Sequence, residues 1–190
     1  MTSFPFKTLM VASAWSAFLG FWIAAKFIWG ARVPKRRAEN WKIFLLSVVA
    51  LTLSAEYLAA GCLLTSFELP RALGSIANAL GPVLLGAGLC FSIWARAALG
   101  RFWSASASLL EGQLLIKEGP YAVVRHPIYA GVMAMLWGSV LLERIGFVVL
   151  TAVLGTAFLA WKSRIEESLL ENTMGMDYAA YKGKTWWILP

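Results

Sequence analysis

The sequence has few charged residues, two cysteines and a single histidine. Charged side chains make up 14% of the 190 residues, whereas soluble domains carry about 25%. Hydrophobic residues reach 59%, an excess that a soluble domain of this size could not bury. The shortage of charge therefore excludes an ordinary cytosolic enzyme, a disordered chain and a fibrous repeat, and it indicates an integral membrane protein.

Side chains that commonly bind metals are also scarce. His126 is the only histidine, and Cys62 and Cys90 each lie inside an apolar run without a C-x-x-C pair. No second histidine or cysteine stands at ligand spacing, so we expect no metal site. Gly86-Ala87-Gly88 lacks the third glycine of a dinucleotide-binding loop and lies within an apolar stretch, so we do not interpret it as one.

Long apolar stretches predict an all-α bundle in the membrane. A helix needs about 20 mostly apolar residues to cross a bilayer. Three stretches have this character, at about Thr8–Trp29, Ile43–Thr65 and Ile76–Trp94. Two shorter ones, Ile128–Leu142 and Gly146–Trp161, are separated by a short polar connection and predict a helical hairpin. We therefore expect an integral membrane bundle of about five transmembrane helices, the last two forming the hairpin.

The first apolar stretch repeats small side chains every four residues, at Ala12, Ser16, Gly20 and Ala24. Residues at this spacing share one face of a helix, and small side chains there let another helix approach closely. We expect this face to pack against a helix of the same chain or of a second copy. The oligomeric state stays open.

Basic residues are concentrated in alternate loops. A net charge of +7 would suggest nucleic-acid binding in a soluble protein. Here the basic residues cluster beside apolar stretches, and basic-rich loops alternate with loops that hold a single arginine. This alternation predicts that the N-terminus lies outside and the C-terminus in the cytoplasm. The same charges favour membrane lipids, and not nucleic acid, as the partner.

Polar residues on the predicted cytoplasmic side fall in two stretches, Ala95–Pro127 and Lys162–Pro190. Late in the first stretch, Gly119-Pro120 indicates a turn. Pro127 suits the first turn of a helix, where its missing N–H costs nothing. His126 is therefore expected at or beside the N-cap of a helix, whose free N–H groups attract anions.

Two further residues belong to the start of this predicted helix. Tyr129 follows His126 by about one helical turn, and Gly131 is expected to open space beside the tyrosine. Both would then lie near the cytoplasmic surface of the membrane.

Acidic residues supply the other candidates. Glu166 and Glu167 follow directly on an apolar stretch, and adjacent residues of a helix point about 100° apart. We therefore expect the two carboxylates to have different tasks, one facing a pocket and the other solvent. Glu56 lies inside the second apolar stretch, where an ionisable residue is either functional or paired internally, with Tyr57 or with an arginine from another helix.

The motifs of the second half of the chain, taken in order, resemble those of a known family. They are Gly119-Pro120-Tyr121, Arg125-His126-Pro127-x-Tyr129-x-Gly131, Glu166-Glu167 and Gly175-x-x-Tyr178-x-x-Tyr181. The set is similar to that of the isoprenylcysteine carboxyl methyltransferase family, and phospholipid N-methyltransferases share much of the pattern. The resemblance covers about Arg96–Pro190 and includes Leu99–Ser104. Met174 stands where the family usually has phenylalanine, and the first two apolar stretches show no matching motif.

The resemblance implies a methyltransferase that uses S-adenosylmethionine and releases S-adenosylhomocysteine. It implies one membrane domain, residues 1–190, with a three-helix membrane part (1–95) and a cytoplasmic-side catalytic region (96–190). The residues that it implicates in cofactor binding are Gly119, Pro120, Tyr121, His126, Tyr129, Gly131, Glu166 and Glu167. The candidates for catalysis are Arg125, Arg164 and Glu167, and which arginine or glutamate acts is left open.

The methyl acceptor is open between two chemistries. A carboxylate on a prenylated or other lipidic molecule is the first expectation, because it is already a nucleophile and needs only an orienting cation such as Arg125 or Arg164. An amine, as in a phospholipid headgroup, must lose a proton, which His126 or a glutamate could accept. Either lipid would enter from the bilayer, in a prokaryotic inner membrane or the endoplasmic reticulum.

Two other interpretations compete with a methyltransferase. A sterol-reductase-like protein has a related C-terminal half, but that group is usually much larger and uses a nicotinamide cofactor. A non-catalytic assembly factor or small transporter would explain the apolar stretches and the loop charges. It would not explain why the Gly-Pro turn, His126 and the glutamate pair fall on one side of the membrane.

Overall fold

The structure, a computed structural model, describes residues 4–29, 66–103 and 115–188. Its helices are α1 (Phe4–Trp29), α3 (Arg71–Leu99), η1 (Gly100–Phe102), η2 (Gly119–Ala122), α4 (Pro127–Glu143), α5 (Gly146–Met174) and α6 (Met176–Lys182), where η marks a short 3-10 helix. The described fold is all-helical, as the sequence predicted, apart from two isolated β-bridges. The predicted span Ile43–Thr65, including Glu56, lies outside the described residues.

The described helices confirm an integral membrane protein. Helices α1, α3 and α5 are long and apolar enough to cross a membrane, and α4 is a shorter apolar helix. The length expected for α5 was wrong, because this helix does not end near Trp161 but continues to Met174. The predicted change from membrane part to catalytic region, between residues 95 and 96, lies inside α3, so the two parts share this helix.

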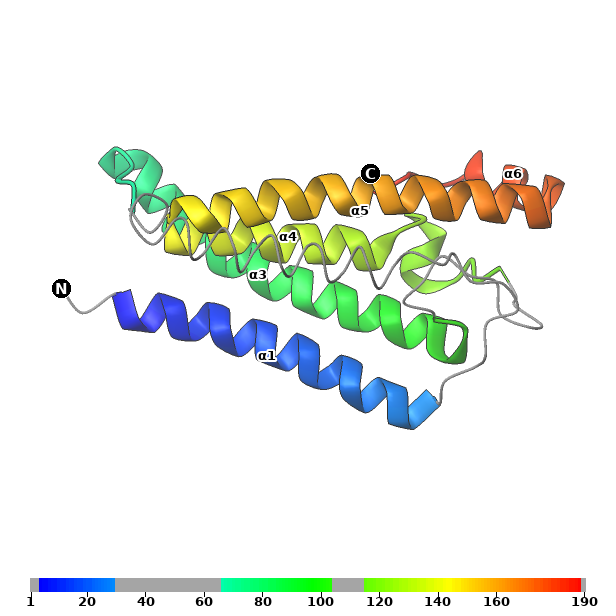
Figure 1. The fold of residues 1–190 in the computed structure, drawn as a ribbon, viewed down its shortest axis with the longest axis horizontal. Helices are drawn as coiled ribbons and strands as arrows, with labels where there is room; N and C mark the ends of the chain where they lie inside the picture. Colours follow the sequence, from blue (N-terminus) through cyan, green and yellow to red (C-terminus); the bar gives the residue numbers. More distant parts are fainter. Residues whose placement is uncertain (1–3, 30–65, 104–114, 189–190) are drawn as a thin grey trace.

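Four helices lie side by side, three in one direction and one in the opposite direction (Figure 1). Helices α1, α3 and α5 run the same way, and α4 runs back along α3 and α5. The ends of α1, α3 and α5 therefore lie at the same end of the bundle as the start of α4, together with η2 and α6. We call this the polar end, because both polar stretches of the sequence meet there.

The predicted helical hairpin between α4 and α5 is confirmed. Arg144 ends α4 in the left-handed conformation (φ 53°), and its N–H donates to the carbonyl of Val140 at 3.0 Å. Its guanidinium donates to the carbonyl of Gly74 at 3.0 Å, near the start of α3. The turn is thus fixed by the arginine's backbone and by its side chain.

The closest helix contact lies between α3 and α4. A Cβ atom added to Gly88 would lie 2.5 Å from the carbonyl oxygen of Gly131, and one on Gly138 would lie 2.7 Å from the N of Leu85. Real side chains do not tolerate such distances, so glycine is required where the two backbones meet. Gly131 was predicted to open space beside Tyr129. That prediction was wrong, because α3 fills the space beside this glycine.

The small side chains of α1 do not pack against the other described helices. Ala12, Ser16, Gly20 and Ala24 are exposed, and a Cβ on Gly20 would have no atom within 4 Å. Packing of this face against a second copy stays a prediction. Helix α1 instead packs through its larger residues, which include Val11, Trp15 and Phe18, against a cluster formed by Leu85, Met135 and Leu142. The Trp15 ring N–H donates to the Ser139 hydroxyl at 3.2 Å.

Candidate functional site

His126 lies at the N-terminal end of α4, as predicted. It is the N-cap residue, Pro127 is the first residue of the helix, and the imidazole is buried. The His126 N–H donates to the carbonyl of Trp187 at 3.2 Å. The histidine is therefore positioned from one side by its helix and from the other by residues 176–188, which we call the C-terminal segment.

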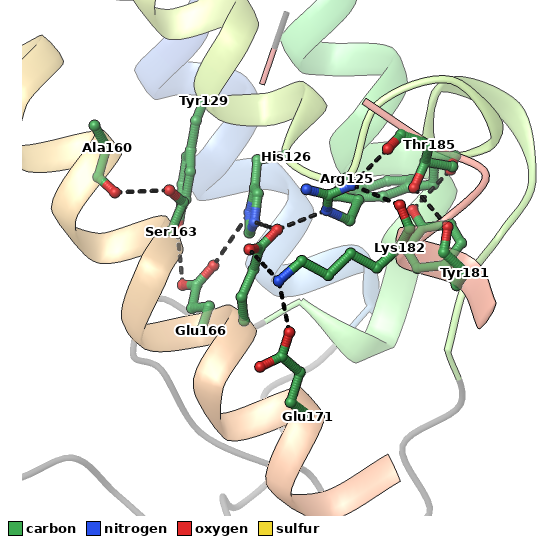
Figure 2. Close-up of polar contacts among 12 residues, drawn as sticks. Arg125, His126, Tyr129, Ala160, Ser163, Glu166, Glu171, Tyr181, Lys182 and Thr185 are labelled. Carbon is green, nitrogen blue, oxygen red and sulfur yellow. Dashed lines mark hydrogen bonds and ion pairs between the residues drawn. The ribbon is translucent and has the colours of Figure 1, made fainter. Parts of the chain in front are cut away.

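Both carboxylates of the glutamate pair face the His126 ring. Glu166 Oε2 lies 3.7 Å from Nδ1, and Glu167 Oε1 lies 3.5 Å from Nε2. The two carboxylates thus share the histidine, and they differ in exposure, at 21% for Glu166 and 4% for Glu167. Two adjacent side chains leave α5 in different directions, but a ring between them can meet one carboxylate on each of its nitrogens (Figure 2).

Tyr129 joins the cluster through both its ring and its hydroxyl. The ring is parallel to that of His126, with centroids 5.5 Å apart. The hydroxyl donates to Glu166 Oε1 at 2.6 Å, and the Lys162 ammonium lies 3.7 Å from the same oxygen. Glu166 is thus positioned by a neutral donor and a cation, and its side chain stays 21% exposed.

Arg125 is engaged in the interior of this cluster. Its Nε donates to Glu167 Oε1 at 2.6 Å, and both side chains are nearly inaccessible, at 8% and 4% exposure. Its Nη1 donates to the carbonyls of Lys182 and Thr185. The guanidinium therefore ties α4, α5 and the C-terminal segment together. It was predicted as a cation for the acceptor, and these bonds occupy two of its nitrogens.

Arg164 lies away from the histidine cluster. It is exposed on α5, and its guanidinium carbon lies 3.9 Å from the centroid of the Trp187 ring. Five of the predicted site residues are thus in contact with one another: Arg125, His126, Tyr129, Glu166 and Glu167. Arg164 and Gly131 lie outside this group. The predicted roles of these two residues toward ligands remain predictions.

The predicted turn at Gly119-Pro120 is confirmed as the short helix η2. Gly119 has a φ of 58°, a conformation that glycine adopts at little cost. A Cβ there would lie 3.6 Å from the Trp94 ring. Tyr121 is buried against Ala95 and Ile128, and its carbonyl accepts a 2.7 Å hydrogen bond from the Tyr181 hydroxyl. The turn is therefore fixed to α3, α4 and α6.

The C-terminal segment contributes residues that were missing from the predicted site. Tyr178 and Tyr181 are buried, and Lys182 Nζ lies 3.6 Å from Glu167 Oε2 and 2.6 Å from Glu171 Oε1. The hydrogen bond to Glu171 raises the pKa of Lys182, so the amine remains a cation. Burial raises the pKa of the Tyr178 hydroxyl, so it remains neutral. The three-residue spacing of the tyrosines was the available signal, since it places both on one helix face.

Backbone pairing joins the C-terminal segment to the loop before α4. Val124 and Trp186 form an isolated parallel bridge, in which the Trp186 N–H donates to Val123 and the Arg125 N–H donates to Trp186, both at 2.9 Å. Single-sequence periodicity does not reveal one pair of bridging residues. This contact was therefore not predictable, although it sets the position of Arg125 and His126.

Two buried polar atoms beside the cluster, the Tyr178 hydroxyl and Trp187 Nε1, have no hydrogen-bond partner, whereas His126 Nε2 has only the 3.5 Å contact with Glu167 Oε1. Buried polar groups are usually hydrogen-bonded, so unsatisfied polar atoms close together indicate a place where a ligand can supply the missing hydrogen bonds. Within residues 4–29, 66–103 and 115–188 no group of three or more histidine, cysteine or acidic side chains could hold a metal ion.

Comparison with known proteins finds one sequence relative and one similar fold. One segment of 80 residues is 29% identical to the uncharacterized protein YpbQ of Bacillus subtilis strain 168, covering 42% of this chain and 48% of YpbQ. The fold is similar to that of the eukaryotic intramembrane Ras methyltransferase ICMT (isoprenylcysteine carboxyl methyltransferase), with a TM-score of 0.54 and 19% identity over 82% of this chain and 53% of that one. This chain therefore spans about half the length of either protein.

A family match covers the site itself. Residues 76–177, just over half of the chain, match the phospholipid methyltransferase family. The matched segment contains the Gly119 turn, His126, Tyr129 and both glutamates, and it ends just before Tyr178. The match agrees with the resemblance seen in the sequence. The chain belongs to the phospholipid methyltransferase family.

Proposed function

We propose that this protein is an S-adenosylmethionine-dependent membrane methyltransferase that methylates a lipidic acceptor. The observation that carries the proposal is the convergence of Arg125, His126, Tyr129 and the glutamate pair at one end of a membrane bundle. Membership of the phospholipid methyltransferase family supports the reaction class. The fold similarity to ICMT supports the architecture.

The residues of the cluster fit the chemistry of the cofactor. S-adenosylmethionine, when bound, supplies a methyl group on a sulfonium, which is already a good leaving group, and it carries an ammonium, a carboxylate and an aromatic base. Glu166 is a partly exposed carboxylate suited to a cationic group. The Tyr178 hydroxyl is a buried polar atom without a hydrogen-bond partner, which a ligand could supply.

The protein's contribution would be positioning and exclusion of water. Arg125, Glu167 and Lys182 hold the loop before α4, α5 and the C-terminal segment in a fixed relation. A prearranged site of this kind can lower the barrier for transfer to a correctly oriented acceptor. No covalent intermediate with the protein is needed.

Two acceptor chemistries have support. A carboxylate on a prenylated or similar lipid agrees with the motif resemblance, and it requires an orienting cation. An amine on a phospholipid headgroup is the second candidate, favoured by the family match and by the Glu166–Tyr129 pair, which offers a carboxylate for an ammonium and for its proton. We propose that either lipid reaches the site laterally from the bilayer and that the polar end faces the cytoplasm.

Binding of S-adenosylhomocysteine to detergent-purified protein tests the proposal. Calorimetry should show saturable binding by the wild type and strong losses in His126→Ala and Glu167→Gln. Tyr129→Phe, which keeps the ring beside His126 but removes the bond to Glu166, should bind the cofactor and lose methyl transfer. Folding of each variant is checked by its helical circular dichroism.

A folded wild type that binds neither S-adenosylmethionine nor S-adenosylhomocysteine, with or without added lipid, would overturn the proposal. The assembly-factor or transporter interpretation would then be preferred. Binding of the cofactor followed by methylation of S-farnesyl-N-acetylcysteine or of phosphatidylethanolamine would distinguish the carboxylate acceptor from the amine acceptor.

A further inference from the structure

A second buried cation, Arg96, lies at the polar end outside the histidine cluster. It is 2% exposed in the last turn of α3. Its guanidinium lies between two indole rings, with its central carbon 4.9 Å from the centroid of Trp29 and 4.7 Å from that of Trp103. Its Nη1 donates to the carbonyl of Gly100 at 2.7 Å, and its Nε is buried without a hydrogen-bond partner.

The charge on Arg96 has no acidic counterpart in the described part of the chain. The ion pairs among these residues involve Arg125, His126, Lys162 and Lys182 as the cations, and not Arg96. A guanidinium stays charged in a protein, and a buried charge normally has a partner of opposite sign. The indole faces and the helix C-terminus attract the cation but carry no full negative charge. The surroundings of Arg96 therefore suit an anion.

Arg96 is connected to the histidine cluster through the η2 turn. Its neighbour Ala95 packs against Tyr121. Tyr129 of the histidine cluster and Trp103, whose ring faces the Arg96 guanidinium, both pack against the group formed by Ala95, Tyr121 and Ile128. Arg96 and the histidine cluster therefore border the same packed group.

We infer that Arg96 binds the anionic group of the methyl acceptor, a carboxylate or a phosphate attached to a lipid. The inference rests on the proposed function for the identity of the ligand as acceptor. The two cations first expected to orient an acceptor, Arg125 and Arg164, are engaged with Glu167 and Trp187. Trp29 is the last residue of α1, and Trp103 directly follows η1.

The aromatic surroundings also suit a lipid. The Trp22 ring contacts that of Trp103 edge to face, at 6.2 Å between centroids, and it stacks on Phe18 at 4.1 Å. This row of rings leads along α1 from Arg96 toward the middle of the bundle. An acyl or prenyl chain could lie along it while the anionic group contacts the guanidinium.

Steady-state kinetics of Arg96→Gln and Arg96→Lys test the inference against the matched control Arg101→Gln. Arg101 is exposed on the neighbouring η1, where its guanidinium lies over the ring of Phe102. Loss of a charged hydrogen bond should raise the acceptor KM of Arg96→Gln by about tenfold or more. The affinity for S-adenosylhomocysteine should not change. Arg96→Lys should recover part of the loss, and Arg101→Gln should behave as the wild type.

Two acceptors distinguish the source of the anion. S-farnesyl-N-acetylcysteine presents a carboxylate, and phosphatidylethanolamine presents a phosphate beside an amine. A KM effect with one of them identifies the group that Arg96 binds. An unchanged KM for both acceptors in Arg96→Gln would overturn the inference, and so would an equal effect in Arg101→Gln.

Indole fluorescence supplies a readout that needs neither cofactor nor turnover. Titration with short-chain phosphatidic acid or with hexanoate should change the emission of the wild type. The change should be smaller in Trp29→Phe and Trp103→Phe and absent in Arg96→Gln. Emission that responds equally in Arg96→Gln would contradict anion binding at Arg96. Because this titration does not use the cofactor, failure of S-adenosylhomocysteine binding would overturn the proposed function alone.

Discussion

At the scale of single residues, the pair formed by Arg125 and Glu167 connects three segments of the protein. The two side chains are buried and share a 2.6 Å contact, while the guanidinium also bonds carbonyls of the C-terminal segment. Removing one member of a buried pair leaves the other charge without compensation. The pair should therefore matter for stability and for the shape of the site together.

Glu167→Gln should lower the free energy of unfolding by about 3 kcal/mol or more, because it leaves Arg125 buried without its counter-ion. The matched control is Glu171→Gln, one turn further along α5, whose pair with Lys182 is exposed at 44% and 40%. Glu171→Gln should lower the free energy of unfolding by less than about 1 kcal/mol. Chemical unfolding in detergent, followed by circular dichroism, measures both. Equal costs for the two variants would contradict the structural role of the buried pair.

At the scale of elements, the contact between α3 and α4 depends on glycine. Gly88 faces Gly131 so closely that an added Cβ would lie 2.5 Å from a backbone oxygen, whereas Gly86 on the same helix has no atom within 4 Å. The two glycines thus provide a comparison within one helix.

Gly88→Ala should destabilise the protein by about 1–3 kcal/mol or more, because the helices must separate or distort to admit the methyl group. Gly86→Ala should be neutral or slightly stabilising, since alanine favours a helix more than glycine does. The midpoint of thermal unfolding in detergent measures the difference. If both variants unfold at the same temperature, the close packing of α3 and α4 is not as described.

The C-terminal segment is the second element with a testable role. Ending the chain at Lys184 removes the carbonyls of Thr185 and Trp186, which bond Arg125, and that of Trp187, which bonds His126. Binding of S-adenosylhomocysteine should be lost, while the helical circular dichroism should change little because the long helices remain. The control is Trp186→Ala, which removes an exposed side chain but keeps the backbone bridge to Val124. Cofactor binding by the truncated chain, equal to that of the control, would show that the bridge is dispensable.

The apolar stretches made α1, α3, α4 and the hairpin predictable, because a membrane helix is defined by its composition over many residues. The second half of α5 was missed since its sequence becomes polar after Trp161, although the helix continues. The histidine and glutamates of the site were predictable from motifs and spacing. The geometry of the site was not predictable, because it requires α4, α5 and the C-terminal segment, about sixty residues from Arg125, to pack together.

At the scale of the whole molecule, the positions of the charged and polar residues predict an orientation. The histidine cluster, Arg96 and the C-terminal segment share the polar end, while the start of α3 and the α4–α5 turn lie at the opposite end. The alternation of basic loops predicts that the polar end lies in the cytoplasm. This orientation would bring the site to the compartment in which the cofactor is made.

Cysteine labelling in intact cells measures the orientation. In a background with Cys62 and Cys90 replaced by serine, a membrane-impermeant maleimide should label Ser75→Cys, which is exposed near the start of α3. It should not label Lys184→Cys, which is exposed at the polar end, until the membrane is permeabilised. The opposite labelling pattern would reverse the proposed orientation.

The bridge between Val124 and Trp186 has a consequence for how the protein is made. During synthesis, Arg125 and His126 emerge from the ribosome well before the residues that pair with their backbone. The long helices can enter the bilayer while this loop still lacks its partner. The site is therefore completed late, after α6 has been translated and the segment beyond it has returned to the loop. Insertion into the membrane and acquisition of activity would be separable events in time.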